Sequence, residues 1–188
     1  MCPPCRNILP VCSVLITSGE FFESCAASFY YKGLVRNSIL RYKFSGRRSY
    51  ASVYAGFLAQ TIEEQYHGGF DVISWVPVSK KRLKKRGYDQ AQLLCEKTAK
   101  KLGLVPRKAL IKTVHNTAQS ELSGVEKRRA NVLSAYEIEP DFSPLGKRIL
   151  LIDDIMTTGA TLSECARTLL MAGADSVLCA VLAYAGRT

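Results

Sequence analysis

The chain has 188 residues, of which 26 are Lys or Arg and 16 are Asp or Glu, so its formal net charge is +10. Hydrophobic residues make up 47% of the chain and charged residues 22%, which excludes wholesale disorder. The sequence has no apolar run long enough to span a membrane, and its N-terminus lacks the pattern of a secretory signal. We therefore expect a cytoplasmic protein of one domain with at most a small appendage.

The first 25 residues form a cysteine-rich segment. Cys2 and Cys5 make a C-x-x-C pair, and Cys12 and Cys25 would complete the four thiolates of a structural Zn²⁺ site, as in a partial zinc ribbon. The alternative is that Cys25, which precedes an apolar stretch, is simply buried. A disulfide framework is not expected, because seven cysteines are an odd number in a chain too long to need such cross-links.

Residues 26–188 are predicted to form one α/β domain. Within it, residues 26–70 do not alternate strands and helices, and they are predicted to form a small hood-like subdomain. From residue 71 strands and helices alternate, which indicates a mainly parallel sheet flanked by helices, with the core sheet in residues 71–188. The expected strands lie at 26–31, 71–76, 109–113, 149–152 and 176–183, and the expected helices around 34–44, 50–66, 89–102 and 161–172.

The most informative stretch is ILLIDDIMTTGAT, residues 149–161. A buried strand is predicted to end at Asp153 and Asp154, and a turn then opens a helix. Ligands bind at the carboxyl ends of parallel strands, where turn N–H groups and a helix N-terminus attract anions. The turn consists of Thr157, Thr158, Gly159, Ala160 and Thr161.

Each residue type in this stretch suits phosphorylated sugars. The threonine hydroxyls can donate to a phosphate, and the two carboxylates suit sugar hydroxyls or a hard cation. All of these residue types are also common as caps and turn residues. Two adjacent carboxylates, however, repel each other unless something bridges them, so a purely structural interpretation explains the whole string less well.

The string resembles the phosphoribosyl pyrophosphate (PRPP) motif of type I phosphoribosyltransferases. Val76-Pro-Val78, RGYDQ at 86–90, Gln119-x-x-Leu-Ser123 and Arg128-x-x-Asn131 add a closer resemblance to the ComF family of competence-associated proteins. The resemblance implies the phosphoribosyltransferase fold, a PRPP or phosphoribosylated ligand with Mg²⁺, and phosphoribosyl transfer. Asp153 and Asp154 would then lie at the ribose hydroxyls, and residues 157–161 around the 5′-phosphate. The position of Asp89 is commonly Asn in this family.

The basic run KKRLKKR, residues 80–86, carries six positive charges and no negative one. The resemblance places the pyrophosphate loop after Pro77, and charges there would stabilise a leaving pyrophosphate. The alternatives are a solvated helix start and a nucleic-acid surface, on which an aromatic ring could stack on a base. The pyrophosphate residues would be Ser79, Lys80, Lys81 and Arg82, and the nucleic-acid contacts Lys84, Lys85, Arg86 and Tyr88.

Residues 114–130 are polar and without a clear period, which predicts a mobile connection. The resemblance implies that this loop closes over PRPP, with Gln119 and Arg128 as contacts. Two functions remain open. One is PRPP binding with phosphoribosyl transfer, and the other is a single-stranded DNA-binding factor that acts in DNA uptake with other uptake proteins.

Overall fold

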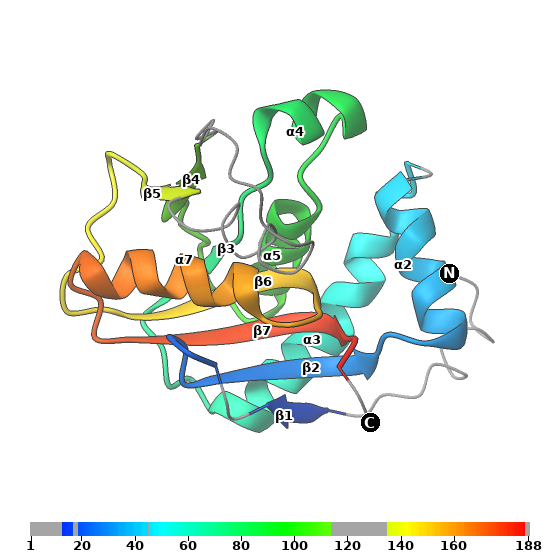
Figure 1. Ribbon diagram of the computed structural model, residues 1–188. Coiled ribbons are helices and arrows are strands. Elements are labelled where there is room, and N and C mark those ends of the chain that lie inside the picture. Colours follow the sequence, from blue (N-terminus) through cyan, green and yellow to red (C-terminus); the bar gives the residue numbers. More distant parts are fainter. Residues whose placement is uncertain (1–12, 17–18, 45, 114–134, 187–188) are drawn as a thin grey trace.

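A five-stranded sheet forms the centre of the computed structural model, which describes residues 13–16, 19–44, 46–113 and 135–186 (Figure 1). The strand order is β1-β2-β7-β6-β3. The last four strands of this order pair in parallel, and β1 is antiparallel at the edge. The carboxyl ends of β3, β6 and β7 therefore meet at one edge of the sheet. The bounds are β1 (Val14–Ile16), β2 (Ser24–Tyr30), β3 (Val72–Trp75), β6 (Arg148–Met156) and β7 (Ser176–Tyr184).

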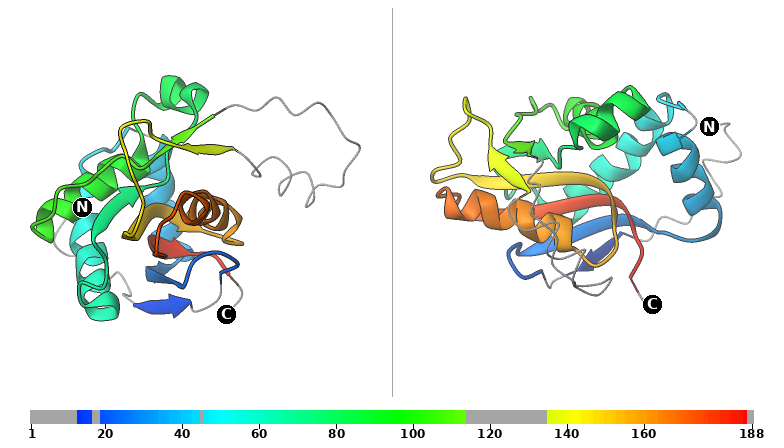
Figure 2. Two further views of the ribbon diagram at one scale, coloured as in Figure 1. Left: turned by 90° about the vertical axis from the view of Figure 1, so that its left-hand side faces the viewer. Right: turned by 45° about the horizontal axis from the view of Figure 1, so that its top comes forward.

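Helices cover both faces of this sheet (Figures 1 and 2). The helices α3 (Tyr50–Tyr66) and α5 (Gln90–Lys101) lie on one face, and α7 (Ala160–Met171) lies on the other. In β6, Leu150 and Ile152 pack toward α3 and α5, while alternate residues pack toward α7. Burial of both faces explains why this strand reads as an unbroken apolar run.

Further elements lie beyond the main sheet (Figure 1). The helix α2 (Gly33–Phe44) follows β2, and the short helix α4 (Lys80–Arg86) follows β3. The strands β4 (Leu110–Lys112) and β5 (Tyr136–Ile138) form a separate antiparallel pair. These elements supply several side chains to the site described below.

The structure confirms the α/β class and the predicted helices, and it corrects the extent of the sheet. The helices α2, α3, α5 and α7 begin and end within a residue of their predicted bounds. The core sheet, however, is not confined to residues 71–188, because β2 pairs with β7 inside it. The inner residues of β2 are buried, so this strand belongs in the interior of a sheet. The predicted strand at 109–113 is β4, which lies outside the main sheet.

Cys25 is a core residue of β2. Its side chain is fully buried, and burial raises the pKa of the thiol well above its usual range. Cys25 therefore lies in the apolar core, which is the alternative that the sequence analysis gave to a zinc ligand. Cys2, Cys5 and Cys12 lie outside the described residues.

In the part of the chain that the structure describes, no helix is both long and apolar enough to cross a membrane.

Candidate functional site

A polar cavity of about 180 Å³ lies at the carboxyl ends of β3 and β6. Its charged side chains come from four different elements: Lys43 of α2, Arg82 and Arg86 of α4, Lys112 of β4, and the two aspartates of β6. Cations outnumber carboxylates in this lining, so the cavity favours an anionic ligand. The other lining residues are Val76, Pro77, Val78, Gln90, Ala91, Tyr136, Ile155 and Thr161.

The paired aspartates lie within β6, which continues beyond them to Met156. Asp154 is buried and forms an ion pair with Lys43, with Nζ 2.9 Å from Oδ1. The Oδ1 atom of Asp153 accepts the backbone N–H of Asp154 at 2.7 Å. Burial and the charge of Asp154 raise the pKa of Asp153 to about 8. The site therefore holds one carboxylate with a cationic partner and one that is readily protonated.

The basic run is a helix, α4, and only one side of it contributes to the cavity. The hydroxyl of Ser79 caps this helix by accepting the N–H of Arg82 at 3.3 Å. Arg82 and Arg86, one helical turn apart, line the cavity. The four lysines of α4 are exposed and do not line it: Lys80, Lys81, Lys84 and Lys85. The structure thus brings only Arg82 of the predicted pyrophosphate residues into the cavity lining.

The segment after α4 fixes Arg86 and the loop after β3. Arg86 donates to Oε1 of Gln90 at 2.7 Å, and Gln90 is buried. The Oδ2 of Asp89 accepts the N–H of Val78 at 3.0 Å, and its Oδ1 accepts the N–H of Gln92 at 3.1 Å. Asp89 therefore joins the start of α5 to the loop that lines the cavity.

Tyr88 is a core residue, so the prediction that it stacks on a base is wrong. Its side chain is buried against Tyr42, with the ring centroids 6.0 Å apart. The Tyr88 hydroxyl donates to the backbone carbonyl of Tyr42. The guanidinium of Arg48 lies over the Tyr88 ring, 4.8 Å from its centroid. These contacts attach the end of α2 to the segment that follows α4.

The small second sheet contributes Lys112 and Tyr136. Lys112 Nζ donates to the Tyr136 hydroxyl at 2.7 Å. Burial lowers the pKa of Lys112. The sequence analysis missed this pair, as it missed Lys43, because isolated lysines and tyrosines in these elements carry no distinguishing pattern.

The turn at residues 157–161 leads from β6 into α7. Gly159 has φ of 78°, a left-handed conformation that suits glycine, and a Cβ there would lie 3.6 Å from the ring of Phe22. The Ala160 N–H donates to Oγ1 of Thr158 at 3.4 Å, and no side chain caps the helix from the N-cap position. The next N–H groups of α7, those of Thr161 and Leu162, are available to an anion.

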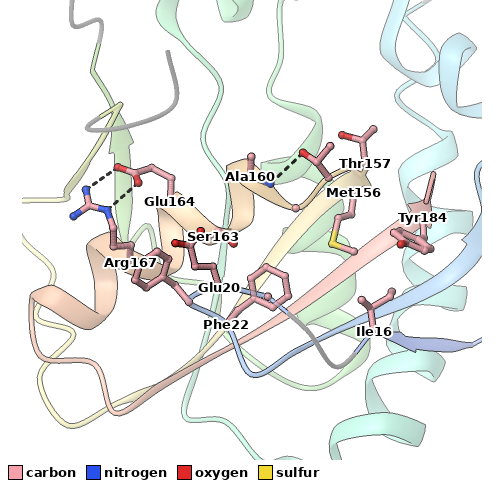
Figure 3. Close-up of a pocket in the computed structure, with 14 residues that line it drawn as sticks. Ile16, Glu20, Phe22, Met156, Thr157, Ala160, Ser163, Glu164, Arg167 and Tyr184 are labelled. Carbon is pink, nitrogen blue, oxygen red and sulfur yellow. Dashed lines mark hydrogen bonds and ion pairs between the residues drawn. The ribbon is translucent and has the colours of Figure 1, made fainter. Parts of the chain in front are cut away.

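This turn separates the polar cavity from a second, larger one. Thr161 lines the polar cavity, whereas residues 157–160 line a cavity of about 520 Å³ between α7 and the segment before β2 (Figure 3). Apolar and aromatic side chains dominate the walls of the larger cavity, and Glu164 and Arg167 pair with each other at 2.8 Å. The structure thus does not place all five turn residues in one cavity with the aspartates. The aromatic and apolar lining residues are Ile16, Phe21, Phe22, Met156 and Tyr184.

The two residues predicted for the flexible loop, Gln119 and Arg128, lie outside the described residues. The residue types of the polar cavity fit a phosphorylated sugar together with Mg²⁺. Arginine and lysine bind phosphate oxygens, and aspartate oxygens are ligands of Mg²⁺ and acceptors for sugar hydroxyls.

Comparisons with known proteins identify the family and the fold of the chain. The family described as "Phosphoribosyl transferase domain" matches residues 90–188. Competence protein ComFC of Bacillus subtilis is 30% identical over 146 residues, which are 77% of this chain and 57% of the relative. ComFC of Streptococcus pneumoniae is 33% identical over 156 residues, which are 80% of this chain and 64% of the relative.

DNA utilization protein YhgH of Salmonella typhi is 32% identical over 139 residues, which are 72% of this chain and 60% of the relative. The chain thus spans about three fifths of the length of these curated relatives. Among solved structures, glutamine PRPP amidotransferase from B. subtilis, complexed with ADP and GMP, has a TM-score of 0.52 and 20% identity. The match covers 76% of this chain and 30% of that one, and it shows the type I phosphoribosyltransferase fold. Since the family match covers more than half of the chain, the chain belongs to the phosphoribosyl transferase domain family, as a homologue of the ComF and YhgH proteins.

Proposed function

We propose that the protein binds PRPP, or a related 5-phosphoribosyl ligand, in the polar cavity at the ends of β3 and β6. One observation carries this proposal: four cationic side chains and two aspartates line the same small cavity beside the uncapped start of α7. Asp153 and Asp154 would accept the ribose hydroxyls. The 5′-phosphate would extend from this cavity onto the turn at residues 157–161, whose amides and hydroxyls would hold it. Arg82, Arg86 and Lys112 would bind the pyrophosphate.

Phosphoribosyl transfer is the reaction that this arrangement would promote. The bond between C1′ and the pyrophosphate oxygen breaks, its electron pair leaves with the pyrophosphate, and an acceptor bonds to C1′. Arg82 and Arg86, which line the cavity, would stabilise the growing negative charge on the leaving group. Mg²⁺, bound together with the diphosphate, would neutralise further charge there.

The test compares two double variants of α4, each of which removes two positive charges. Arg82→Gln with Arg86→Gln changes the side that lines the cavity, and Lys81→Gln with Lys84→Gln changes the exposed side. Calorimetric titration with PRPP and Mg²⁺ should show a loss of about tenfold or more in affinity for the arginine variant, because charge-assisted hydrogen bonds are lost. The lysine variant should bind as the wild type does. Absence of PRPP binding in the wild type, or equal losses in both variants, would reject the proposal.

A second function is favoured by the exposed side of α4. Its four lysines have no carboxylate partner among the described residues, and the names of the relatives refer to competence and DNA utilization. We propose that this side binds single-stranded DNA through its phosphates. Fluorescence anisotropy with a labelled oligonucleotide should show affinity that falls steeply with salt, and the Lys81→Gln, Lys84→Gln variant should flatten this slope. A wild type that binds no oligonucleotide at low salt would reject this second function.

A further inference from the structure

Lys43 is a cationic side chain of the polar cavity that pairs with Asp154. Its ammonium group lies 2.9 Å from Oδ1 of Asp154, and the two side chains are only 18% and 11% exposed. Asp154 is one of the two carboxylates that the proposed function assigns to the ribose hydroxyls, and carboxylate oxygens are also ligands that Mg²⁺ prefers. In the structure a residue of the protein itself already neutralises this carboxylate.

The position of Lys43 is fixed by its neighbour on α2. The Tyr42 hydroxyl donates to the backbone carbonyl of Gln90 at 2.8 Å, and the Tyr42 carbonyl accepts the hydroxyl of Tyr88. Tyr42 is fully buried. The backbone at the end of α2 is therefore held against the segment that supplies Arg86 and Gln90 to the cavity, and Lys43 reaches Asp154 from there.

The other charged side chains of the cavity also disfavour a free metal ion. Lys43, Arg82, Arg86 and Lys112 outnumber the two aspartates, so a free divalent cation meets a net positive surface. The same positive surface attracts a polyphosphate. The charges of the cavity therefore favour a polyphosphate with its bound metal ion over a free metal ion.

We propose that Lys43 is a built-in counter-ion of Asp154 that excludes free divalent metal from the aspartate pair and makes the cavity accept a polyphosphate ligand first. Mg²⁺ then enters with the ligand or after it. This inference rests on the proposed function, because it concerns the cation that accompanies the phosphoribosyl ligand.

The test measures Mn²⁺ alone and inorganic pyrophosphate alone, each by titration against the full chain. Wild-type protein should bind pyrophosphate without metal and should bind Mn²⁺ weakly. Lys43→Met should raise the affinity for Mn²⁺ by about tenfold or more, because Asp154 loses its competing cation, and should lower the affinity for pyrophosphate several-fold. Lys97→Met removes the same charge from an exposed position of α5 that does not line the cavity, and it should change neither affinity.

Lys43→Gln provides a second variant of similar size that can still donate to Asp154, should the Met variant fail to fold. Wild-type protein that binds Mn²⁺ as tightly as the folded Lys43 variant would overturn the inference, as would pyrophosphate that binds only when metal is present. Neither titration uses PRPP. A chain that binds pyrophosphate and excludes Mn²⁺ but does not bind PRPP would therefore contradict the proposed function and leave the inference standing.

Discussion

Asp153 and Asp154 are neighbours in the chain but face opposite sides of the sheet. Asp154 reaches Lys43 on the side that α3 and α5 cover. Asp153 lies toward α7, where burial and the charge of Asp153 raise the pKa of the Cys165 thiol. One carboxylate thus has a cationic partner at 2.9 Å and the other accepts a backbone N–H. Replacing each with its neutral isostere should therefore change stability in opposite directions.

Asp153→Asn is expected to stabilise the unliganded protein at neutral and alkaline pH. Burial and the charge of Asp154 raise the pKa of Asp153 to about 8, whereas an Asp in an unfolded chain has a pKa of about 3.9. Between these values the folded state binds more protons than the unfolded state, so stability falls as the pH rises from about 4 to about 8. The variant lacks this dependence. A gain of about 1 kcal/mol would raise Tm by about 2–4 °C.

Thermal melts at pH 5 and pH 8 check this prediction. The difference in Tm between the variant and the wild type should be larger at pH 8 than at pH 5. A variant less stable than the wild type at pH 8 would show that the Asp153 charge contributes to the fold.

Asp154→Asn is expected to destabilise the protein, because Lys43 loses its partner while its side chain remains only 18% exposed. A loss of about 1–3 kcal/mol in the free energy of unfolding is expected, measured by denaturant titration. Asp71→Asn is the matched control. It breaks the ion pair between Asp71 and Arg148, in which the nitrogen and oxygen atoms are 2.8 Å apart. The Arg148 and Asp71 side chains are 48% and 44% exposed. Water therefore screens this ion pair, and the loss of stability should be smaller. Equal losses in the two variants would contradict the account of Lys43.

The sequence alone was sufficient to predict the helices and strands whose signals are local. The apolar run before Asp153 predicted a strand, and the threonine and glycine turn predicted the start of a helix; both predictions are confirmed by β6 and α7. The helical spacing of Arg82 and Arg86 was also present in the sequence. On a helix this spacing places both arginines on one side, which is the side of α4 that lines the cavity.

The remaining contributions come from tertiary contacts that no local pattern records. Lys43 and Lys112 lie far from β6 in the chain and reach the same cavity only through the packing of α2 and the second sheet. Tyr88 lies next to a basic run, which suggested exposure, but its hydroxyl bonds to the end of α2 and its ring is buried. These features depend on which segments meet in three dimensions.

Thr158→Val should weaken binding of ribose 5-phosphate while leaving the fold nearly unchanged. Thr158 is exposed, and its Oγ1 contacts only the nearby N–H of Ala160, at 3.4 Å, in the hydrogen bonds of the described residues. Loss of one charge-assisted donor to a phosphate costs about 1.5–3 kcal/mol of binding free energy. Calorimetry checks the affinity and a thermal melt checks the fold. Ser52→Ala, an exposed hydroxyl of α3, is the control. Unchanged affinity in Thr158→Val would remove this turn from the phosphate site.

Asp89 provides a test of how the loop after β3 is held. Its two carboxylate oxygens accept the N–H groups of Val78 and Gln92, at 3.0 and 3.1 Å, so one side chain both caps α5 and fixes a residue of the cavity lining. Asp89→Ala removes both acceptors and leaves two partly buried N–H groups, those of Val78 and Gln92, without this partner. We expect a loss of about 1–2 kcal/mol in the free energy of unfolding and weaker binding of pyrophosphate, because Val78 is no longer held.

Asp89→Asn separates this role from a requirement for charge. The amide keeps one acceptor oxygen and remains a good N-cap, so it should restore most of the stability that Asp89→Ala loses and part of the affinity for pyrophosphate. Denaturant titration and calorimetry with pyrophosphate measure the two effects in the same samples. If the Asn variant is as unstable as the Ala variant, the carboxylate acts through its charge. If the Ala variant binds pyrophosphate as the wild type does, the loop keeps its place without Asp89, and the hydrogen bond to Val78 has no part in shaping the cavity.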